Sequence, residues 1–105
     1  MHDPTLLVIN PGSTSTKVAI FQGRQIEASD TLRHDAAAIA AFPRIFDQFD
    51  MRRDAVNKFL SDSSFPVERL SAVIGRGGVL PPVEGGVYIV DDVLVGALLE
   101  YGWNH

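Results

Sequence analysis

Residues 5–21 read TLLVINPGSTSTKVAIF, and this stretch decides the fold. Its two ends, 6–9 and 18–21, are short apolar runs of the kind that form buried β-strands. The runs are separated by a small polar turn in which Pro11 and Gly12 interrupt the strand pattern. The stretch therefore predicts two neighbouring strands joined by a turn that is rich in hydroxyl groups.

The turn is the first candidate site. It combines backbone N–H groups with the amide of Asn10, the hydroxyls of Ser13 and Ser15, and the ammonium group of Lys17. Such groups suit phosphate oxygens, those of ATP or of its magnesium shell. Alternate residues of a strand share a face, so Ser15 and Lys17 are expected to point the same way. The turn is not a P-loop, because Thr16 stands where that motif has glycine and a strand rather than a helix follows. From composition alone, a hairpin with a solvated lysine is the simpler interpretation.

Composition limits the class of protein. The chain has 105 residues, at most one domain, with the 46% hydrophobic and 21% charged content of ordinary globular proteins. A net charge of −4 offers no basic surface for nucleic acid or an anionic membrane. The absence of cysteine excludes disulfides, thiolate metal sites and a cysteine nucleophile. Because neither a membrane-length apolar run nor a signal peptide is found, we expect a cytoplasmic protein.

The rest of the pattern predicts a mixed α/β chain. Three strands with short connections are expected to form an antiparallel meander at about 6–10, 16–22 and 25–32. A fourth strand at 70–75 follows a helical region, so a right-handed crossover would place it parallel to a strand of the meander. A brief strand at 87–90 and a helix from 93 to about 101 follow, with Asp91 and Asp92 as caps. Three strands followed by helix, strand and helix are typical of the opening of a ribonuclease H-like or actin-like domain.

Two helical segments are predicted between the third and fourth strands, and Pro43 interrupts the first of them. The 34–49 segment is rich in alanine, and its regularly spaced phenylalanines are expected in the core: Phe42, Phe46 and Phe49. His34 opens this segment and is interpreted as a cap or a surface residue. The second helix, at 51–60, is expected to present Arg52 largely to solvent.

Arg76 is the second candidate. It is flanked by glycines and lies just beyond the carboxyl end of a predicted strand, where open α/β sheets bind ligands. Its guanidinium could bind a carboxylate or a phosphate through two hydrogen bonds. A flexible surface loop with a solvated arginine explains the pattern equally well. Glu84 lies in the following Pro- and Gly-rich segment without an identifiable partner, so we interpret it as exposed.

Two blocks together resemble one family. Residues 8–17, VINPGSTSTK, resemble the amino-terminal phosphate motif of butyrate kinases, in the acetate kinase-like group. Residues 75–88, GRGGVLPPVEGGVY, resemble the second block of that family, in the family's order. Acetate kinases share the Asn, Gly, Ser and Lys of the first block but differ around the arginine, so the butyrate or branched-chain fatty acid subgroup fits better.

The resemblance implies a two-domain actin-like kinase that needs Mg²⁺. The implied reaction is reversible transfer of the ATP γ-phosphoryl group to butyrate or a similar short-chain carboxylate, giving acyl phosphate and ADP. By resemblance, Asn10 helps to hold the magnesium–phosphate unit, Lys17 lies near the nucleotide phosphates, and Arg76 binds the acyl substrate or its phosphate. The turn around the phosphates corresponds to Gly12, Ser13 and Ser15.

Complete members of this family are several times longer than this chain. Residues 1–105 are therefore interpreted as an incomplete amino-terminal actin-like domain that lacks the second, nucleotide-binding domain and is inactive alone. The full-length kinase is expected to be a homo-oligomer. The alternatives are an acetate or propionate kinase fragment, a non-catalytic phosphate- or nucleotide-binding module, and an inert remnant.

Overall fold

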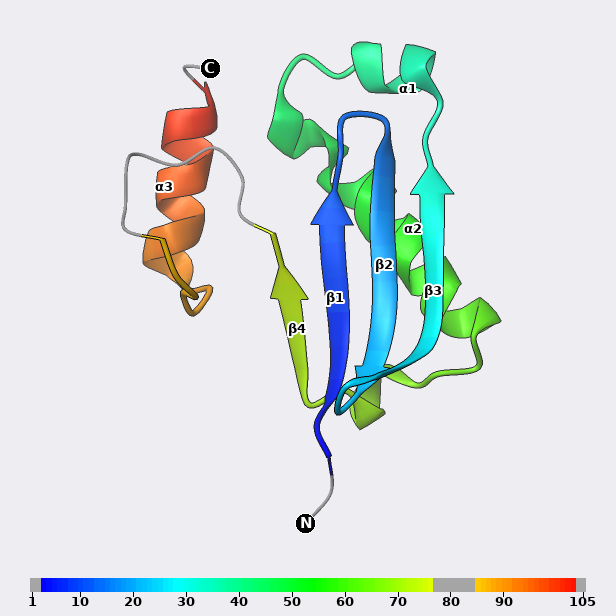
Figure 1. Cartoon of the computed structure of the whole chain (residues 1–105). Helices are drawn as coiled ribbons and strands as arrows, with labels where there is room; N and C mark the ends of the chain where they lie inside the picture. The colour runs from blue at the N-terminus through cyan, green and yellow to red at the C-terminus, as the bar shows by residue number, and fades with distance from the viewer. Residues whose placement is uncertain (1–2, 77–84, 104–105) are drawn as a thin grey trace.

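The computed structural model describes residues 3–76 and 85–103, and it confirms the mixed α/β class (Figure 1). The predicted Glu84 lies outside the described residues. The elements in chain order are β1 (Thr5–Pro11), β2 (Ser15–Gln22), β3 (Gln25–Arg33), α1 (Ala36–Ala40), η1 (Ile45–Gln48), α2 (Phe49–Asp62), η2 (Val67–Arg69), β4 (Ala72–Gly75) and α3 (Asp92–Trp103).

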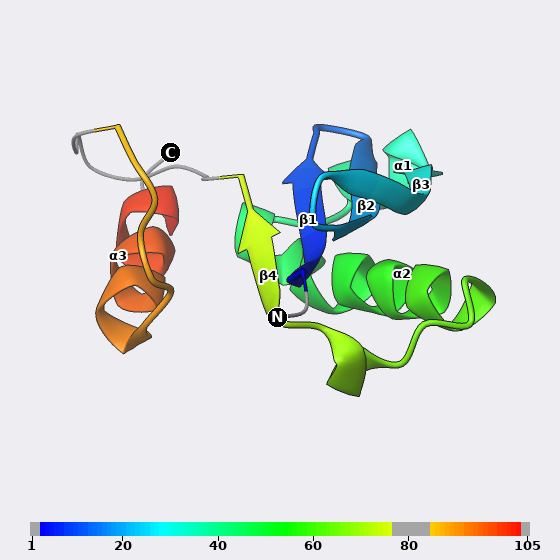
Figure 2. The same ribbon diagram turned by 60° about the horizontal axis from the view of Figure 1, so that its bottom comes forward.

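The strands form one sheet in the order β3-β2-β1-β4. β1 and β2 pair antiparallel, as do β2 and β3. β4 pairs with β1 in parallel, as the crossover argument predicted, and lies at the edge of the sheet (Figure 1). The chain between β3 and β4 contains α2, which covers one face of the sheet (Figure 2).

The core lies between α2 and the covered face of the sheet. The two-residue period of the strands and the helical period of α2 bring two apolar stripes together. Their buried members are Leu7, Val18, Ile20, Val56, Phe59 and Leu60. Thr16 is on the same face of β2 and is only 1% exposed, which makes it the one buried polar residue among those described. The opposite face, toward the viewer in Figure 1, has no helix over it in the described part of the chain.

The prediction of a phenylalanine core was wrong. Phe46 and Phe49 are 47% and 52% exposed, and their rings stack on each other with centroids 5.6 Å apart. Phe42 is half-buried. The physical reason is the break at Pro43: α1 ends at Ala40 and the chain resumes as a 3₁₀ turn, so the three rings do not share one helical stripe.

Two predictions about helix starts have different outcomes. Asp35, rather than His34, caps α1, because its Oδ1 accepts the N–H of Ala37 at 3.1 Å. Asp91 caps α3 as predicted, accepting the N–H of Leu94 on Oδ1 at 2.8 Å. Asp92 is the first residue of that helix.

The predicted strand at 87–90 does not form. These residues are of the types that favour strands, but Val87 is 95% exposed and Ile89 is 88% exposed. A strand needs a neighbour for its hydrogen-bond ladder, and no described strand pairs with this segment. None of the described helices is long and apolar enough to cross a lipid bilayer.

Candidate functional site

The tip of the β1–β2 hairpin is a compact turn. β1 ends at Pro11 and β2 begins at Ser15, and the N–H of Gly12 donates to the carbonyl of Ser15 at 2.7 Å. The carbonyl of Thr14 accepts the N–H of His34 at 2.8 Å, which ties the turn to the end of β3. A Cβ on Gly12 would lie 3.3 Å from Ser15 Oγ, so the turn leaves little room there for a side chain.

The sheet brings Asn10 and Lys17 together. They are directly opposite in the antiparallel ladder, and the alternation of the strands puts both on the uncovered face. In the parallel ladder Ile9 is opposite Gly75, and the N–H of Arg76 donates to the carbonyl of Ile9 at 3.0 Å. Position 76 therefore continues the ladder beside Asn10 at the same end of the sheet.

The sequence-predicted residues thus converge on one end of the uncovered face. Ser15 is on the same face of β2 as Lys17, as the strand alternation predicted. Gly12 and Ser13 form the adjoining turn, and Lys17 is exposed. That these residues bind phosphate, nucleotide or magnesium remains a prediction.

The prediction that Arg52 lies on the wet side of its helix was wrong. Arg52 is in the first turns of α2, beneath the hairpin tip, and its guanidinium donates five hydrogen bonds. The acceptors are Gly12 O at 2.7 Å, Thr16 Oγ1 at 2.9 Å, Ser15 O at 3.0 Å, Gln48 Oε1 at 3.0 Å and Ser13 O at 3.3 Å. A tight turn exposes carbonyls that need donors, and the planar guanidinium supplies several in a fixed arrangement. Burial lowers the pKa of Arg52 below its ordinary value.

A three-residue network supports the tip from below. Thr16 Oγ1 lies 2.9 Å from Arg52 Nη1 and 2.8 Å from His34 Nε2. Arginine only donates, so the Thr16 oxygen accepts from Arg52, while the direction of its hydrogen bond with His34 Nε2 depends on which ring nitrogen carries the proton. Burial, and then the charge of Arg52, lower the pKa of His34. The network therefore favours the neutral imidazole.

A signal for Arg52 was present in the sequence. Positions 52, 56, 59 and 60 share one face of a helix, and Val56, Phe59 and Leu60 are the buried residues of α2. Arg52 therefore begins the apolar stripe and cannot face away from the sheet. Arg53 is the solvent-facing neighbour, with ion pairs to Asp50 at 3.4 Å and Asp54 at 3.2 Å.

An apolar groove lies on the other side of the hairpin tip from Lys17. Ile9, Phe46, Phe49 and Val56 contribute apolar surface to it, and Arg52 lies at its wall. The groove accounts for the exposed phenylalanines, which border it instead of filling the core. It does not contain Asn10 or Lys17, so it is separate from the predicted phosphate site.

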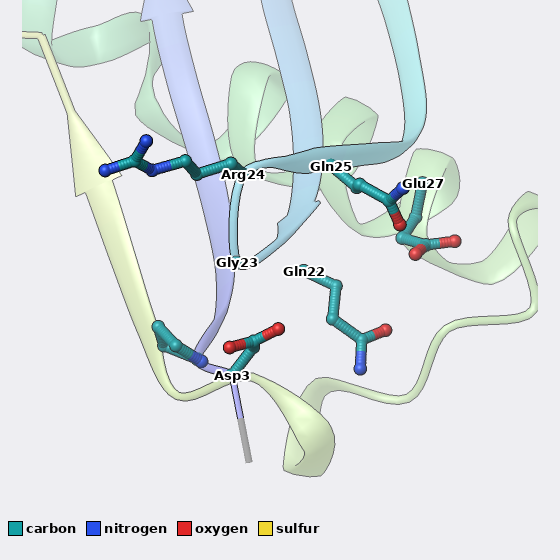
Figure 3. Close-up of a pocket in the computed structure, with 7 residues that line it drawn as sticks. Asp3, Gln22, Gly23, Arg24, Gln25 and Glu27 are labelled. Carbon is teal, nitrogen blue, oxygen red and sulfur yellow. The ribbon is translucent and has the colours of Figure 1, made fainter. Parts of the chain in front are cut away.

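A polar hollow lies at the opposite end of the sheet, around the β2–β3 turn (Figure 3). Figure 3 shows that its charged side chains, those of Asp3, Arg24 and Glu27, point in different directions. They do not converge on a point where a ligand could sit. Within residues 3–76 and 85–103, no group of three or more His, Cys, Asp or Glu side chains is arranged to hold a metal ion.

Comparison with known proteins finds relatives over most of the chain. Over 90 residues, or 86% of its length, the chain is 44% identical to butyrate kinase 2 of Clostridium acetobutylicum. It has the same identity over the same length to probable butyrate kinases of Clostridium botulinum strains Eklund 17B and Alaska E43. The chain is homologous to butyrate kinases. It spans 25% of the length of these butyrate kinases. No family model matches it.

The predicted resemblance to butyrate kinases is therefore confirmed. The matched region covers 86% of this chain. The names of these relatives indicate kinases, which are transferases.

Proposed function

We propose that this chain forms part of a carboxylate kinase that transfers the ATP γ-phosphoryl group to butyrate or a similar short-chain fatty acid. The observation that carries the proposal is the cross-strand pair of Asn10 and Lys17, with position 76 beside it, in a chain homologous to butyrate kinases. The order of the strands and the parallel β4 support a partial actin-like, ribonuclease H-like domain.

The proposed reaction brings two anions together. A carboxylate oxygen of butyrate forms a bond to the γ-phosphorus, and the bond from that phosphorus to the bridging oxygen of ADP breaks. The electron pair of that bond leaves with ADP, and no proton has to move. Because the nucleophile is already ionised, the protein's task is positioning and neutralisation of charge. Lys17 supplies one positive charge at the hairpin, and Arg76 supplies a second at the end of β4.

Asn10 fits a magnesium ion that arrives with the nucleotide. Mg²⁺ in kinases keeps several waters and takes ligands from the substrate phosphates, so the protein supplies only a few ligands of its own, of which the Asn10 amide oxygen would be one. Asn10 is half-buried and faces the same side as Lys17, and this shared face supports the proposal that its amide holds an ion together with the phosphates. When bound, Mg²⁺ would neutralise phosphate charge.

The chain by itself is proposed to bind nucleotide phosphate without turnover. It spans 25% of the length of the butyrate kinases that it matches. The adenosine site and the remaining groups at the transferred phosphoryl are proposed to lie in a second domain. An acetate or propionate kinase would use the same hairpin, because the difference between these substrates lies in the acyl pocket.

Isothermal titration of the chain with Mg·ATP tests this proposal. We expect Lys17→Met to weaken binding about tenfold or more, because it removes a charge in contact with phosphate. Lys58→Met is the matched control: Lys58 is on α2, exposed, and paired with Asp62 at 2.6 Å. Equal binding by the Lys17 variant, or no binding by the unaltered chain, would refute the phosphate site. Butyrate-dependent release of ADP by the chain alone would contradict the absence of turnover.

A further inference from the structure

The four carbonyl groups of the hairpin tip all have partners within the protein. Arg52 Nη2 donates to the carbonyls of Gly12 and Ser13, and Arg52 Nη1 donates to that of Ser15. The carbonyl of Thr14 accepts the backbone N–H of His34. The acceptors of the turn are therefore all used inside the fold, although the turn lies at the end of a hairpin where water could have served them.

The N–H groups of the same turn are directed elsewhere. In a trans peptide the C=O and the following N–H point in opposite directions, and the described residues contain no cis peptide. Because the carbonyls of Gly12 and Ser13 point at Arg52, the N–H groups of Ser13 and Thr14 point away from it. Within the described part of the chain, neither N–H has a hydrogen-bond partner.

We propose that Arg52 is a positioning residue that holds the hairpin tip with two consecutive N–H groups free for the phosphates of the nucleotide. This inference rests on the proposed function and extends it to a residue that touches the loop and not the ligand. Without Arg52, the carbonyls of Gly12 and Ser13 would be free to turn toward the ligand, where their partial negative charge would oppose an anion.

The arrangement requires the shape of arginine as well as its charge. The two Nη atoms of one planar group reach three carbonyls and the Thr16 hydroxyl, and Nε reaches Gln48, which fixes the plane of the group. A lysine would retain the positive charge but has a single nitrogen with three donors, so it cannot reproduce this set. Arg52→Lys therefore keeps the positive charge but loses the hydrogen bonds that orient the loop, so it distinguishes orientation of the loop from electrostatic attraction of the ligand.

The test compares Arg52→Lys and Arg52→Gln with Arg53→Gln. The control removes the same charge one residue along α2, from a side chain that pairs with Asp50 and Asp54 and makes no hydrogen bond to the turn among the described residues. Isothermal titration with Mg·ATP, and separately with tripolyphosphate, measures affinity, and circular dichroism verifies the fold of each variant. We expect both Arg52 variants to bind about tenfold or more weakly, and Arg53→Gln to bind as the unaltered chain does. Full affinity in Arg52→Lys would overturn the inference.

Amide NMR spectra of the unaltered chain supply a second readout that needs no variant. On addition of tripolyphosphate, the amide protons of Ser13 and Thr14 should move downfield as they form hydrogen bonds to the anion. If phosphate binds and shifts residues near Lys17 while these two amides stay in place, the inference is wrong even if every Arg52 variant unfolds. If the unaltered chain binds neither probe, the proposed function fails and the inference fails with it.

Discussion

Substitution of Thr16 by valine is expected to destabilise the fold through a single missing hydroxyl. Thr16 is 1% exposed, and its oxygen lies between Arg52 Nη1 at 2.9 Å and His34 Nε2 at 2.8 Å. Valine has almost the same shape and an equally good strand propensity, so the change removes the two hydrogen bonds and little else.

The magnitude follows from the contacts. Loss of a hydrogen bond to a charged donor costs about 1.5–3 kcal/mol, and the imidazole nitrogen of His34 also loses its partner. The methyl group that replaces the hydroxyl returns at most about 0.8 kcal/mol of apolar burial. The free energy of unfolding should therefore fall by about 1–2 kcal/mol, which for a domain of this size lowers Tm by roughly 5–15 °C.

Urea titration followed by circular dichroism measures the change. Thr31→Val is the matched control, because Thr31 lies on the uncovered face of β3 opposite Lys17 and its hydroxyl makes no hydrogen bond among the described residues. That variant should remain within about 0.5 kcal/mol of the unaltered chain. If Thr16→Val is as stable as Thr31→Val, the hydroxyl does not join Arg52 to His34 and the network is not a support of the hairpin tip.

Two further predictions concern pH and backbone strain. Burial and Arg52 lower the pKa of His34, so its stabilising contribution is complete above the unfolded-state value of about 6.5 and is lost as pH falls through the lower folded-state pKa. The urea midpoint should decline as pH falls across this window, and His34→Gln should remove the part of the decline that comes from protonation of His34. If the midpoint of the variant falls with pH as steeply as that of the unaltered chain, the prediction is wrong. Gly23 has φ of 59° and a Cβ there would lie 3.0 Å from Asp3 Oδ2, so Gly23→Ala should cost about 1 kcal/mol in the same titration. Gly96→Ala, in the helical α3 with open space around it, should not destabilise, and equal losses in both variants would show that the left-handed backbone is not the cause.

The strands could be predicted from sequence because short apolar runs were bounded by turn residues. The predicted 16–22 and 25–32 match β2 at Ser15–Gln22 and β3 at Gln25–Arg33 closely. The strand predicted at 70–75 begins later, at Ala72, because the 3₁₀ turn η2 and its exit occupy the preceding residues. The segment at 87–90 has strand-forming residues but pairs with none of the described strands, and intrinsic preference alone does not make a sheet.

The candidate site could be predicted in part, because its residues are close in sequence or follow directly from strand alternation. Asn10 and Lys17 face each other because a tight turn fixes the register of the hairpin. The support of that turn by Arg52 was missed, since the charge of the residue was given more weight than its place at the head of an apolar helical stripe. Its acceptors are mostly backbone carbonyls far away in sequence, and a residue pattern does not display such partners.

The alternation of β2 has a consequence for how this hairpin can change over evolutionary time. Val18 and Ile20 point into the core, whereas Lys17 and Ala19 lie on the open face. Substitutions at the open positions can alter what the surface recognises while the core stays intact. Binding specificity and stability of the fold can therefore change almost independently along one strand. Thr16 is the exception, because it faces the interior yet fixes the arginine that shapes the tip. At this position, selection for a stable fold and selection for binding specificity act on the same side chain.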